Sequence, residues 1–522
     1  MRKPVITARQ AVEHITNGAT VTLGGVSGGG VPESILREME TAFLQTGAPR
    51  ELFVVHAGGL GDHASRGVIH LAHEGLMARV MTGHYGLQEP VAQLALENKV
   101  EAYDLPQGVI SQLFRAIAAH RPGVVTQVGL GTFLDPRFGD RGKMNARTTE
   151  EYASLLTIEG TEWMLYKSFP IQVALLRGTT ADEEGNITLE HETSFWDLLS
   201  QAEAVHNSGG IVIVEVKRLA QAGTLDPRQV KIPGFLVDYL VVDDHPTMNW
   251  KTRFDASYVG EIKKPEGAIE PIPLDLRKII ARRAAMELHA GDVANIGAGI
   301  ADKVPSVITE EGYVDQVVFT EEPGIIGGTG GFGLDFGSAT NPTAIIDQAY
   351  MFDFYDGGGL DMAFLSFVEC DPAGNVNVSK LSNRIEGPGG FINITSAARQ
   401  INFMGTFTAH GLQARLHDGH LRILQEGCYR KFCQHVSHLT LNAKQARAKG
   451  QRILYITERA VFEMVSDGIE LKEIAPGIDL KKDILEQIPF SLKIAADLKE
   501  MDPRIFREAP MGMTIQPKEA RR

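Results

Sequence analysis

The chain has few cysteines and fewer basic than acidic residues. Only three of its 522 residues are cysteine, at positions 370, 428 and 433. That number is too small for a disulfide framework and indicates a reducing compartment. Lysine and arginine total 51 against 65 aspartate and glutamate residues, which gives a formal net charge of −14. This balance argues against a nucleic-acid partner, because such a surface needs a basic face.

Long apolar runs are also missing. No stretch approaches the roughly 20 apolar residues that a membrane helix requires. The opening residues "MRKPVITARQAVEHI" contain no apolar segment followed by a small-residue cleavage site, so they do not resemble a signal peptide. We therefore expect a cytoplasmic protein with no membrane partner. The length favours two domains of roughly 250 residues each.

Several common active-site motifs are absent. Neither glycine cluster, "GGVSGGG" (24–30) or "GAG" (297–299), is GxGxxG in a complete dinucleotide unit, and no GxxxxGK[ST] is present, which argues against the standard NAD and ATP sites. Histidines group in "HLAHEG" (70–75) and "EHE" (190–192), but both lack the further paired ligands of a zinc site. Surface or hydrogen-bonded histidines are the better interpretation. No metal site is predicted.

Glycine is abundant, with 55 residues, and the glycine-rich stretches show an internal repeat. "ARQAVEHITNGATVTLGGVSGGGVP" (8–32) aligns without a gap on "ARRAAMELHAGDVANIGAGIADKVP" (281–305), with seven identical positions. Each copy predicts a helix, a glycine stop, a short strand, a glycine turn and a second helix near a proline. The pair "DEEGNITL" (182–189) and "DPAGNVNV" (371–378) predicts a hairpin in each half. We infer duplication of one α/β domain.

Apolar runs alternate with amphipathic segments. "IVIVEVKR" (211–218), "VVFT" (317–320) and "MAFLSFVE" (362–369) are typical of buried strands, and "VISQLFRAIAAH" (109–120) of a helix. The alternation predicts α/β domains, each a largely parallel sheet flanked by helices. The polar, proline-bearing stretch 243–273 is the predicted linker between domains 1–242 and 274–522. Ligands in such folds bind at the carboxyl ends of strands, often between domains.

One such strand end carries two carboxylates. In "FTEEPGIIGGTGGFG" (319–333), Glu321 and Glu322 follow the apolar run and precede a proline and several glycines. The glycines allow another backbone or a ligand to come close. One interpretation is a solvated strand end. The other is a carboxylate nucleophile that forms a covalent acyl intermediate.

These residues belong to a set of stretches that resembles the family I coenzyme A transferases, of the single-chain acetate/propionate type with fused α and β subunits. The family's Glu-x-Gly motif reads "EPGIIGG" here, so that Glu322 is the matching glutamate and Glu321 lies one residue too early. Pro323 departs from the small residue that relatives often carry there. Further matching stretches run nearly from end to end: "YDLPQGVISQLFRA" (103–116), "PGVVTQVGLGTFLDPR" (122–137), "VHNSGGIVIVEV" (205–216), "DFYDGGGLD" (353–361), "GPGGFINI" (387–394) and "YITERAVF" (455–462).

The resemblance implies transfer of CoA from a short-chain acyl-CoA to a free carboxylate, without ATP or a metal, through a glutamyl-CoA thioester on Glu322. CoA would be a substrate and a transient adduct, with no permanently bound cofactor, and the chain would form a homodimer or homotetramer. The active site would lie between the halves. The implied site residues are Gln107 and the backbone of Gly389 or Gly390 as oxyanion donors, Gly297, Ala298, Gly299, Ile300, Ala301 and Asn393 for CoA, and Gly28, Gly29 and Gly30 for the acyl pocket.

Alternatives remain open on the sequence alone. Without the resemblance, Gln107 reads as a turn residue between a strand and a helix, and "GPGG" as a plain turn. A non-catalytic binding protein of the same fold family would lack the glutamate motif, and a CoA hydrolase would let water take the acyl group. Acetate, propionate, butyrate and acetoacetate all remain candidate acids.

Overall fold

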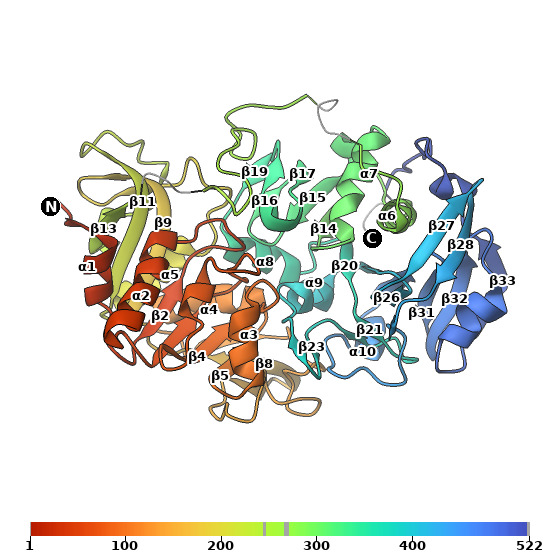
Figure 1. Cartoon of the computed structure of the whole chain (residues 1–522), viewed down its shortest axis with the longest axis horizontal. Coiled ribbons are helices and arrows are strands. Elements are labelled where there is room, and N and C mark those ends of the chain that lie inside the picture. Colours follow the sequence, from red (N-terminus) through yellow and green to blue (C-terminus); the bar gives the residue numbers. More distant parts are fainter. Residues whose placement is uncertain (1, 244–246, 266–270, 519–522) are drawn as a thin grey trace.

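Two ten-stranded sheets, one from each half of the chain, organise the molecule (Figure 1). The computed structural model describes residues 2–243, 247–265 and 271–518. Within these ranges, none of the helices is both long and apolar enough to span a lipid bilayer. The predicted linker 243–273 includes residues 244–246 and 266–270, which lie outside the described residues, and its boundaries stay a prediction.

The first sheet has eight strands in a continuous parallel row, and two short strands off this path. All ten residues of its long central strand are buried, as expected for a parallel strand covered on both faces. In spatial order the row is β1 (Val5–Ile6), β13 (Tyr239–Val242), β11 (Ile211–Ala220), β9 (Val173–Asp182), β2 (Thr20–Leu23), β3 (Leu52–Val55), β4 (Met77–Thr82) and β5 (Glu101–Asp104), with β10 (Ile187–Thr188) and β12 (Val230–Ile232) beside it.

The second sheet has a parallel centre and mostly antiparallel edges. Its parallel part includes β15, which ends at Glu321, directly before Glu322. In spatial order it contains β19 (Ala344–Ile345), β16 (Ile325–Ile326), β15 (Val318–Glu321), β14 (Val293–Ile296), β20 (Met362–Ser366), β25 (Gln400–Met404), β30 (Arg452–Ile456), β31 (Ala460–Val465), β32 (Gly468–Ile474) and β33 (Lys493–Glu500).

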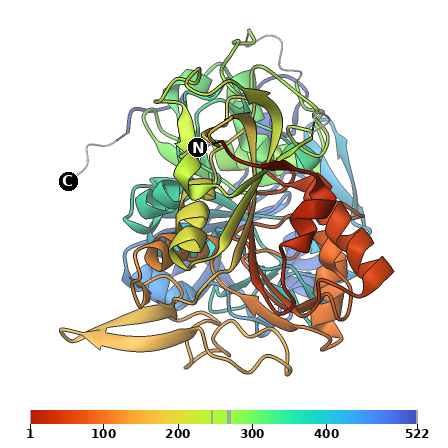
Figure 2. The same ribbon diagram turned by 90° about the vertical axis from the view of Figure 1, so that its left-hand side faces the viewer.

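Helices and small sheets complete the two halves. The α-helices are α1 (Ala8–Glu13), α2 (Glu33–Thr46), α3 (Glu89–Leu96), α4 (Gln107–Ala118), α5 (Leu198–Asn207), α6 (Leu276–Ala285), α7 (Val304–Glu310), α8 (Gln348–Asp356), α9 (Phe391–Ala397) and α10 (Ala443–Ala448). A hairpin of β7 (Ala153–Ile158) and β8 (Thr161–Lys167), extended by β6 (Gly123–Thr126), projects from the first half (Figure 2). The remaining two-stranded sheets are β17–β18 (Thr329–Gly330, Ala339–Thr340), β21–β22 (Glu369–Cys370, Val376–Asn377), β23–β24 (Lys380–Leu381, Arg384–Ile385), β26–β29 (Thr408–Ala409, Tyr429–Arg430) and β27–β28 (Gln413–His417, His420–Gln425).

The predicted duplication corresponds to a repeated structural unit. The spatial order β13-β11-β9-β2-β3 of the first sheet is matched by β30-β25-β20-β14-β15 of the second. Both predicted hairpins form, and they use the same bonds. The amide N–H groups of Asn186 and Asn375 donate to Oδ1 of Asp182 and Asp371, each at 3.0 Å. The predicted fold class, two α/β domains with largely parallel sheets, is confirmed.

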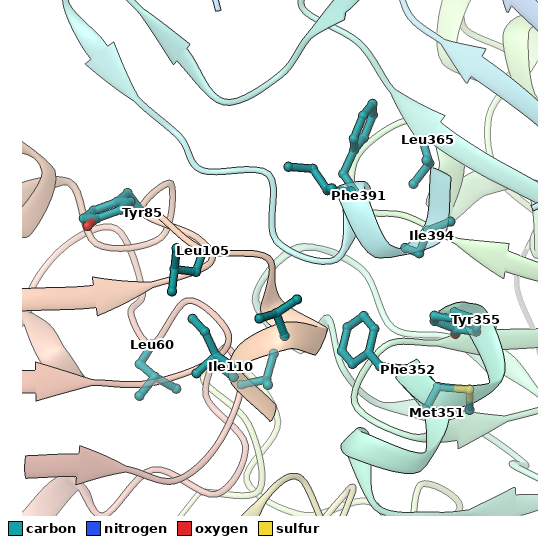
Figure 3. Packing of buried hydrophobic residues seen from close by; sticks show 14 of the residues in the cluster. Leu60, Tyr85, Leu105, Ile110, Met351, Phe352, Tyr355, Leu365, Phe391 and Ile394 are labelled. Atoms are coloured by element: carbon teal, nitrogen blue, oxygen red, sulfur yellow. The ribbon is translucent and has the colours of Figure 1, made fainter. Parts of the chain in front are cut away.

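The two halves meet through helices that lie between the sheets. α4 of the first half contacts α8 and α9 of the second. Figure 3 shows Ile110 of α4 beside Leu60 of the first half, with Phe352 of α8 on the opposite side of α4. A side chain on Gly108 would overlap the Phe352 ring, so only glycine permits this approach. Because these apolar residues are all buried, one core continues from half to half.

Candidate functional site

Glu322 lies in a tight hairpin turn at the carboxyl end of β15. The strand ends at Glu321 and pairs antiparallel with β16, which begins at Ile325. Gly324 has φ +105°, and a Cβ there would overlap the carbonyl oxygen of Ile346, so the turn requires glycine. The Glu322 side chain is turned into the protein: the residue is 8% exposed. Among the described residues, its Oε2 has no hydrogen-bond partner.

A turn of the second half, residues 386–390, is held by backbone groups of the first half. The N–H of Gln107, the first residue of α4, donates to Gly389 O at 3.1 Å, and Gly389 N–H donates to Gly83 O at 2.6 Å. Tyr85 N–H donates to Glu386 O at 2.6 Å. These bonds fix α4 and the 386–390 turn relative to each other.

Glu322 and Gln107 both lie against this turn. A Cβ added to Gly390 would be 2.8 Å from Glu322 Cγ, and one added to Gly389 would be 3.5 Å from Gln107 Oε1. The four residues that the resemblance assigns to catalysis therefore gather at one place between the halves. Because Gly389 N–H already donates to Gly83 O, Gly390 is the better candidate for a backbone oxyanion donor.

Burial changes the acidity of both glutamates. It raises the pKa of Glu322 to about 7, because a buried carboxylate loses its hydration. Burial, and then the neighbouring charge of Glu322, raise the pKa of Glu321 well above its usual range. The two side chains separate: Glu321 packs against Gly330 and Glu322 against Gly390. At neutral pH the site thus holds a carboxyl that readily becomes a poorly solvated carboxylate.

The residues predicted to bind CoA fall into two places. Residues 297–301 follow β14, the parallel neighbour of β15, and so lie at the same sheet edge as Glu322. Ala298 and Gly299 are exposed there. Asn393 instead is fully buried between the halves, accepting from Gly108 N–H at 3.0 Å and donating to Asp356 at 2.9 Å. Its polar atoms are engaged within the protein, and its CoA contact stays a prediction.

The glycines predicted for the acyl pocket are covered by two tryptophans. Trp250 lies against Gly28, and the Trp196 ring lies against Gly29 and Gly30. The segment that carries Trp196 also reaches the Glu322 turn, because the Ser194 hydroxyl donates to Pro323 O. The loop 28–30 is thus linked to the Glu322 turn through residues 194–196.

Several residues at the site carry no local sequence signal. Gln107 Nε2 donates to Gln348 Oε1 at 3.0 Å. Gln348 Nε2 lies 2.8 Å from both Asp197 Oδ2 and Ser111 Oγ. All four side chains are buried. Gln107 and Gln348 are 241 positions apart, so no local pattern could reveal the pair. Trp250 lies inside the predicted linker, and its position at the site has no sequence signal either.

The histidine clusters are hydrogen-bonded. The Nδ1 and Nε2 atoms of His70 lie 2.6 Å and 2.9 Å from carboxylate oxygens of Glu40 and Glu33. The described part of the chain contains no group of three or more His, Cys, Asp or Glu side chains arranged to hold a metal ion.

Comparisons with known proteins identify relatives that match nearly the whole chain. Residues 5–243 match the family model described as coenzyme A transferase. The caffeate CoA-transferase of Acetobacterium woodii is 45% identical over 97% of this chain and 98% of its own length. The acetate CoA-transferase YdiF of Escherichia coli (strain K12) is 42% identical over 98% of this chain and 97% of its own length. A crystal structure of the acyl-CoA transferase YdiF from E. coli O157:H7, as a thioester complex with CoA, superposes with a TM-score of 0.95 at 41% identity, covering 99% and 98% of the two chains.

The Gly390 contact generates a prediction. Gly390 has φ −79°, so alanine fits its backbone, but the new Cβ would lie 2.8 Å from Glu322 Cγ and 3.1 Å from Oε1. We expect a crystal structure of Gly390→Ala to show the Glu322 carboxyl displaced by a few tenths of an ångström or more. Gly357→Ala, with a similar φ of −77°, is the matched control and should leave Glu322 in place. A Glu322 carboxyl that does not move in Gly390→Ala would contradict the contact.

Proposed function

The chain belongs to the coenzyme A transferase family, and from that premise we propose that it transfers CoA from a short-chain acyl-CoA to a free carboxylic acid. The observation that carries the proposal is the buried Glu322 carboxyl, with one oxygen that has no hydrogen-bond partner among the described residues, beside Gly390 in the turn that Gln107 also contacts at Gly389. A carboxylate can serve as an acyl-accepting nucleophile. The two neighbours are hydrogen-bond donors of the kind that stabilise an oxyanion.

The proposed reaction is ping-pong. Glu322 attacks the thioester carbonyl, the C–S bond breaks, and an acyl-glutamyl anhydride and CoA thiolate form. The thiolate then attacks the glutamyl carbonyl, the anhydride C–O bond breaks, the first acid leaves, and a glutamyl-CoA thioester remains. The acceptor carboxylate enters by the reverse steps. One thioester is consumed and one is made, so neither ATP nor net proton transfer is required.

The environment of Glu322 favours transfer over hydrolysis. The 8% exposure of Glu322 limits the access of water to an anhydride or thioester formed there. The Gln107 amide and the Gly390 N–H would each stabilise the tetrahedral oxyanions. Each such donor contributes a factor of about 10²–10³ in kcat.

CoA would approach from the exposed turn 297–301, at the same sheet edge as Glu322. Backbone amides of this turn would offer local positive potential to its phosphates. Lys303, which follows the turn and lies 3.8 Å from the Phe332 ring centroid and 3.2 Å from Asp302 Oδ1, would add a cation beside it.

The acceptor acid is proposed to be small. The named relatives include an acetate CoA-transferase and a caffeate CoA-transferase, so family membership alone does not identify the acceptor acid. Here the Trp196 ring fills the space over Gly29 and Gly30, which leaves little room for an aromatic acid beside them. We also propose that the enzyme is a homo-oligomer and works in the cytoplasm, where its three unpaired cysteines would remain reduced.

The test is a transfer assay with acetyl-CoA and a panel of C2 to C6 acids and caffeate, in the wild type and three variants. Glu322→Ala should abolish transfer. Gln107→Ala should lower kcat by roughly 10- to 1000-fold, as expected for one lost oxyanion donor. Glu321→Ala is the matched control and should retain transfer, because its side chain packs away from Gly390.

The product pattern separates the alternatives. New acyl-CoA that appears only when an acceptor acid is present supports a transferase. Free CoA released at the same rate with and without an acceptor would show a hydrolase instead. Transfer that survives Glu322→Ala would contradict the proposal.

A pH dependence follows from the burial of Glu322. A pKa of about 7 means that the carboxyl is protonated, and not nucleophilic, below neutral pH. We therefore expect kcat/KM for acyl-CoA, which reports the free enzyme, to fall about tenfold per unit as the pH decreases below 7. The same fall of kcat/KM below pH 7 should persist in Asp197→Asn, which removes the other nearby carboxyl with a pKa of about 7. A flat profile down to pH 5 would contradict the assignment.

A further inference from the structure

We propose that Gln348 and Asp197 are positioning residues that orient the Gln107 amide so that an N–H, and not the carbonyl oxygen, faces the reacting carbonyl at Glu322. This inference rests on the proposed function. Both residues would act on the reaction through Gln107, whose amide is the group that meets the oxyanion.

A chain of buried hydrogen bonds crosses between the halves. Gln107 Nε2 donates to Gln348 Oε1 at 3.0 Å, and Gln348 Nε2 donates to Asp197 Oδ2 at 2.8 Å and to Ser111 Oγ at 2.8 Å. Ser111 Oγ lies 3.1 Å from both Asp197 Oδ2 and Gln107 O. Gln348 and Ser111 are fully buried, and Gln107 and Asp197 are 5% exposed. Water therefore offers these side chains few alternative partners.

The chain fixes the orientation of both amides. A glutamine amide can sit in either of two flipped positions, one placing oxygen and the other nitrogen at a given point. Asp197 Oδ2 accepts from both Ser111 Oγ and Gln348 Nε2, so it selects the position in which Gln348 turns its NH₂ group toward it. Gln348 Oε1 then faces Gln107 and selects the Gln107 NH₂ group in turn. One Gln107 N–H is used in that bond, and the second is left for an oxyanion.

The duplication explains why two glutamines meet here. Gln107 begins α4 and Gln348 begins α8, and these are the last helices before the equivalent strands β9 and β20. The pair therefore joins corresponding positions of the two halves. Their surroundings differ: Asp197 precedes α5, whereas Gly390 precedes α9, the helices before the equivalent strands β11 and β25. One copy has a carboxylate where the other has a glycine turn, so only Gln107 faces the nucleophile.

A double-mutant cycle tests the proposal. Gln348→Leu should lower kcat by about 10- to 100-fold, a part of the effect of losing the donor itself, with the affinity for CoA and the thermal midpoint little changed. In a Gln107→Ala background the same substitution should cost less than about twofold, because Gln348 has nothing left to orient. The matched control is Gln112→Leu, which removes another α4–α8 hydrogen bond, to Asp353 and Asp356, without touching Gln107. It should leave kcat within about twofold.

Two outcomes would overturn the proposal. Equal losses from Gln348→Leu in both backgrounds would indicate a purely structural role. Unchanged kcat on Gln348→Leu in both backgrounds would show that the orientation of Gln107 does not depend on Gln348. Failure of the proposed function looks different, since Gln107→Ala alone would then leave turnover unchanged.

Exchanging the carboxylate and the amide between positions 348 and 197 separates the orienting role from misfolding. Gln348→Glu places a second buried carboxylate opposite Asp197. It should lower kcat by at least about tenfold, because like charges at this distance cannot both remain ionised. Adding Asp197→Asn restores a donor opposite the new carboxylate, which still accepts from Gln107. The double variant should recover at least about tenfold over Gln348→Glu. A double variant as slow as the single one would contradict the orienting role.

Discussion

The backbone bonds that join α4 to the 386–390 turn are the constraint on which the site depends. Gln107 and Gly389 form the first of them at 3.1 Å, and Gly389 and Gly83 the second at 2.6 Å. Each links residues that are far apart in the chain, and each is shielded from water by the core shared between the halves. Glu322 sits against the same turn from the other side. A carboxyl, an amide and a backbone N–H thereby come together at one turn.

The duplicated halves have equivalent strands at the site, but the residues that follow these strands differ between the halves. Thr20 of β2 pairs with Phe53 of β3 as the equivalent Val293 of β14 pairs with Val318 of β15, so Ala57 corresponds to Glu322 and His56 to Glu321. His56 is fully buried, and burial lowers its pKa to about 4, so it is a neutral imidazole at pH 7 and offers no carboxylate to acylate. The carboxylate that we propose as the nucleophile is therefore confined to one half. The other half contributes Gln107 and Asp197, which we propose orients Gln107 through Gln348.

Features carried by neighbouring residues could be predicted from the sequence. The hydrophobic pattern 109–120 corresponds to α4, residues 107–118, and both DxxxN turns form the expected hairpins. Glu322 could be identified because its motif is local. The Gln107–Gln348 pair could not, since its members are 241 positions apart and each begins an ordinary helix. Trp250 falls in a segment whose polar, irregular composition predicts a linker; its burial against Gly28 is a tertiary contact that composition does not encode.

The most direct measurement of the central claim is the location of the covalent intermediate. The protein is incubated with acyl-CoA without an acceptor acid, treated with borohydride or hydroxylamine, digested and analysed by mass spectrometry. A thioester has an activated carbonyl, so the account predicts reduction or hydroxamate formation at Glu322 alone, within the peptide that contains "EEPGIIGG". Glu321→Ala should keep the modification and Glu322→Ala should lose it. Modification at Glu321 in the wild type, or an unmodified protein that still transfers CoA, would contradict the account.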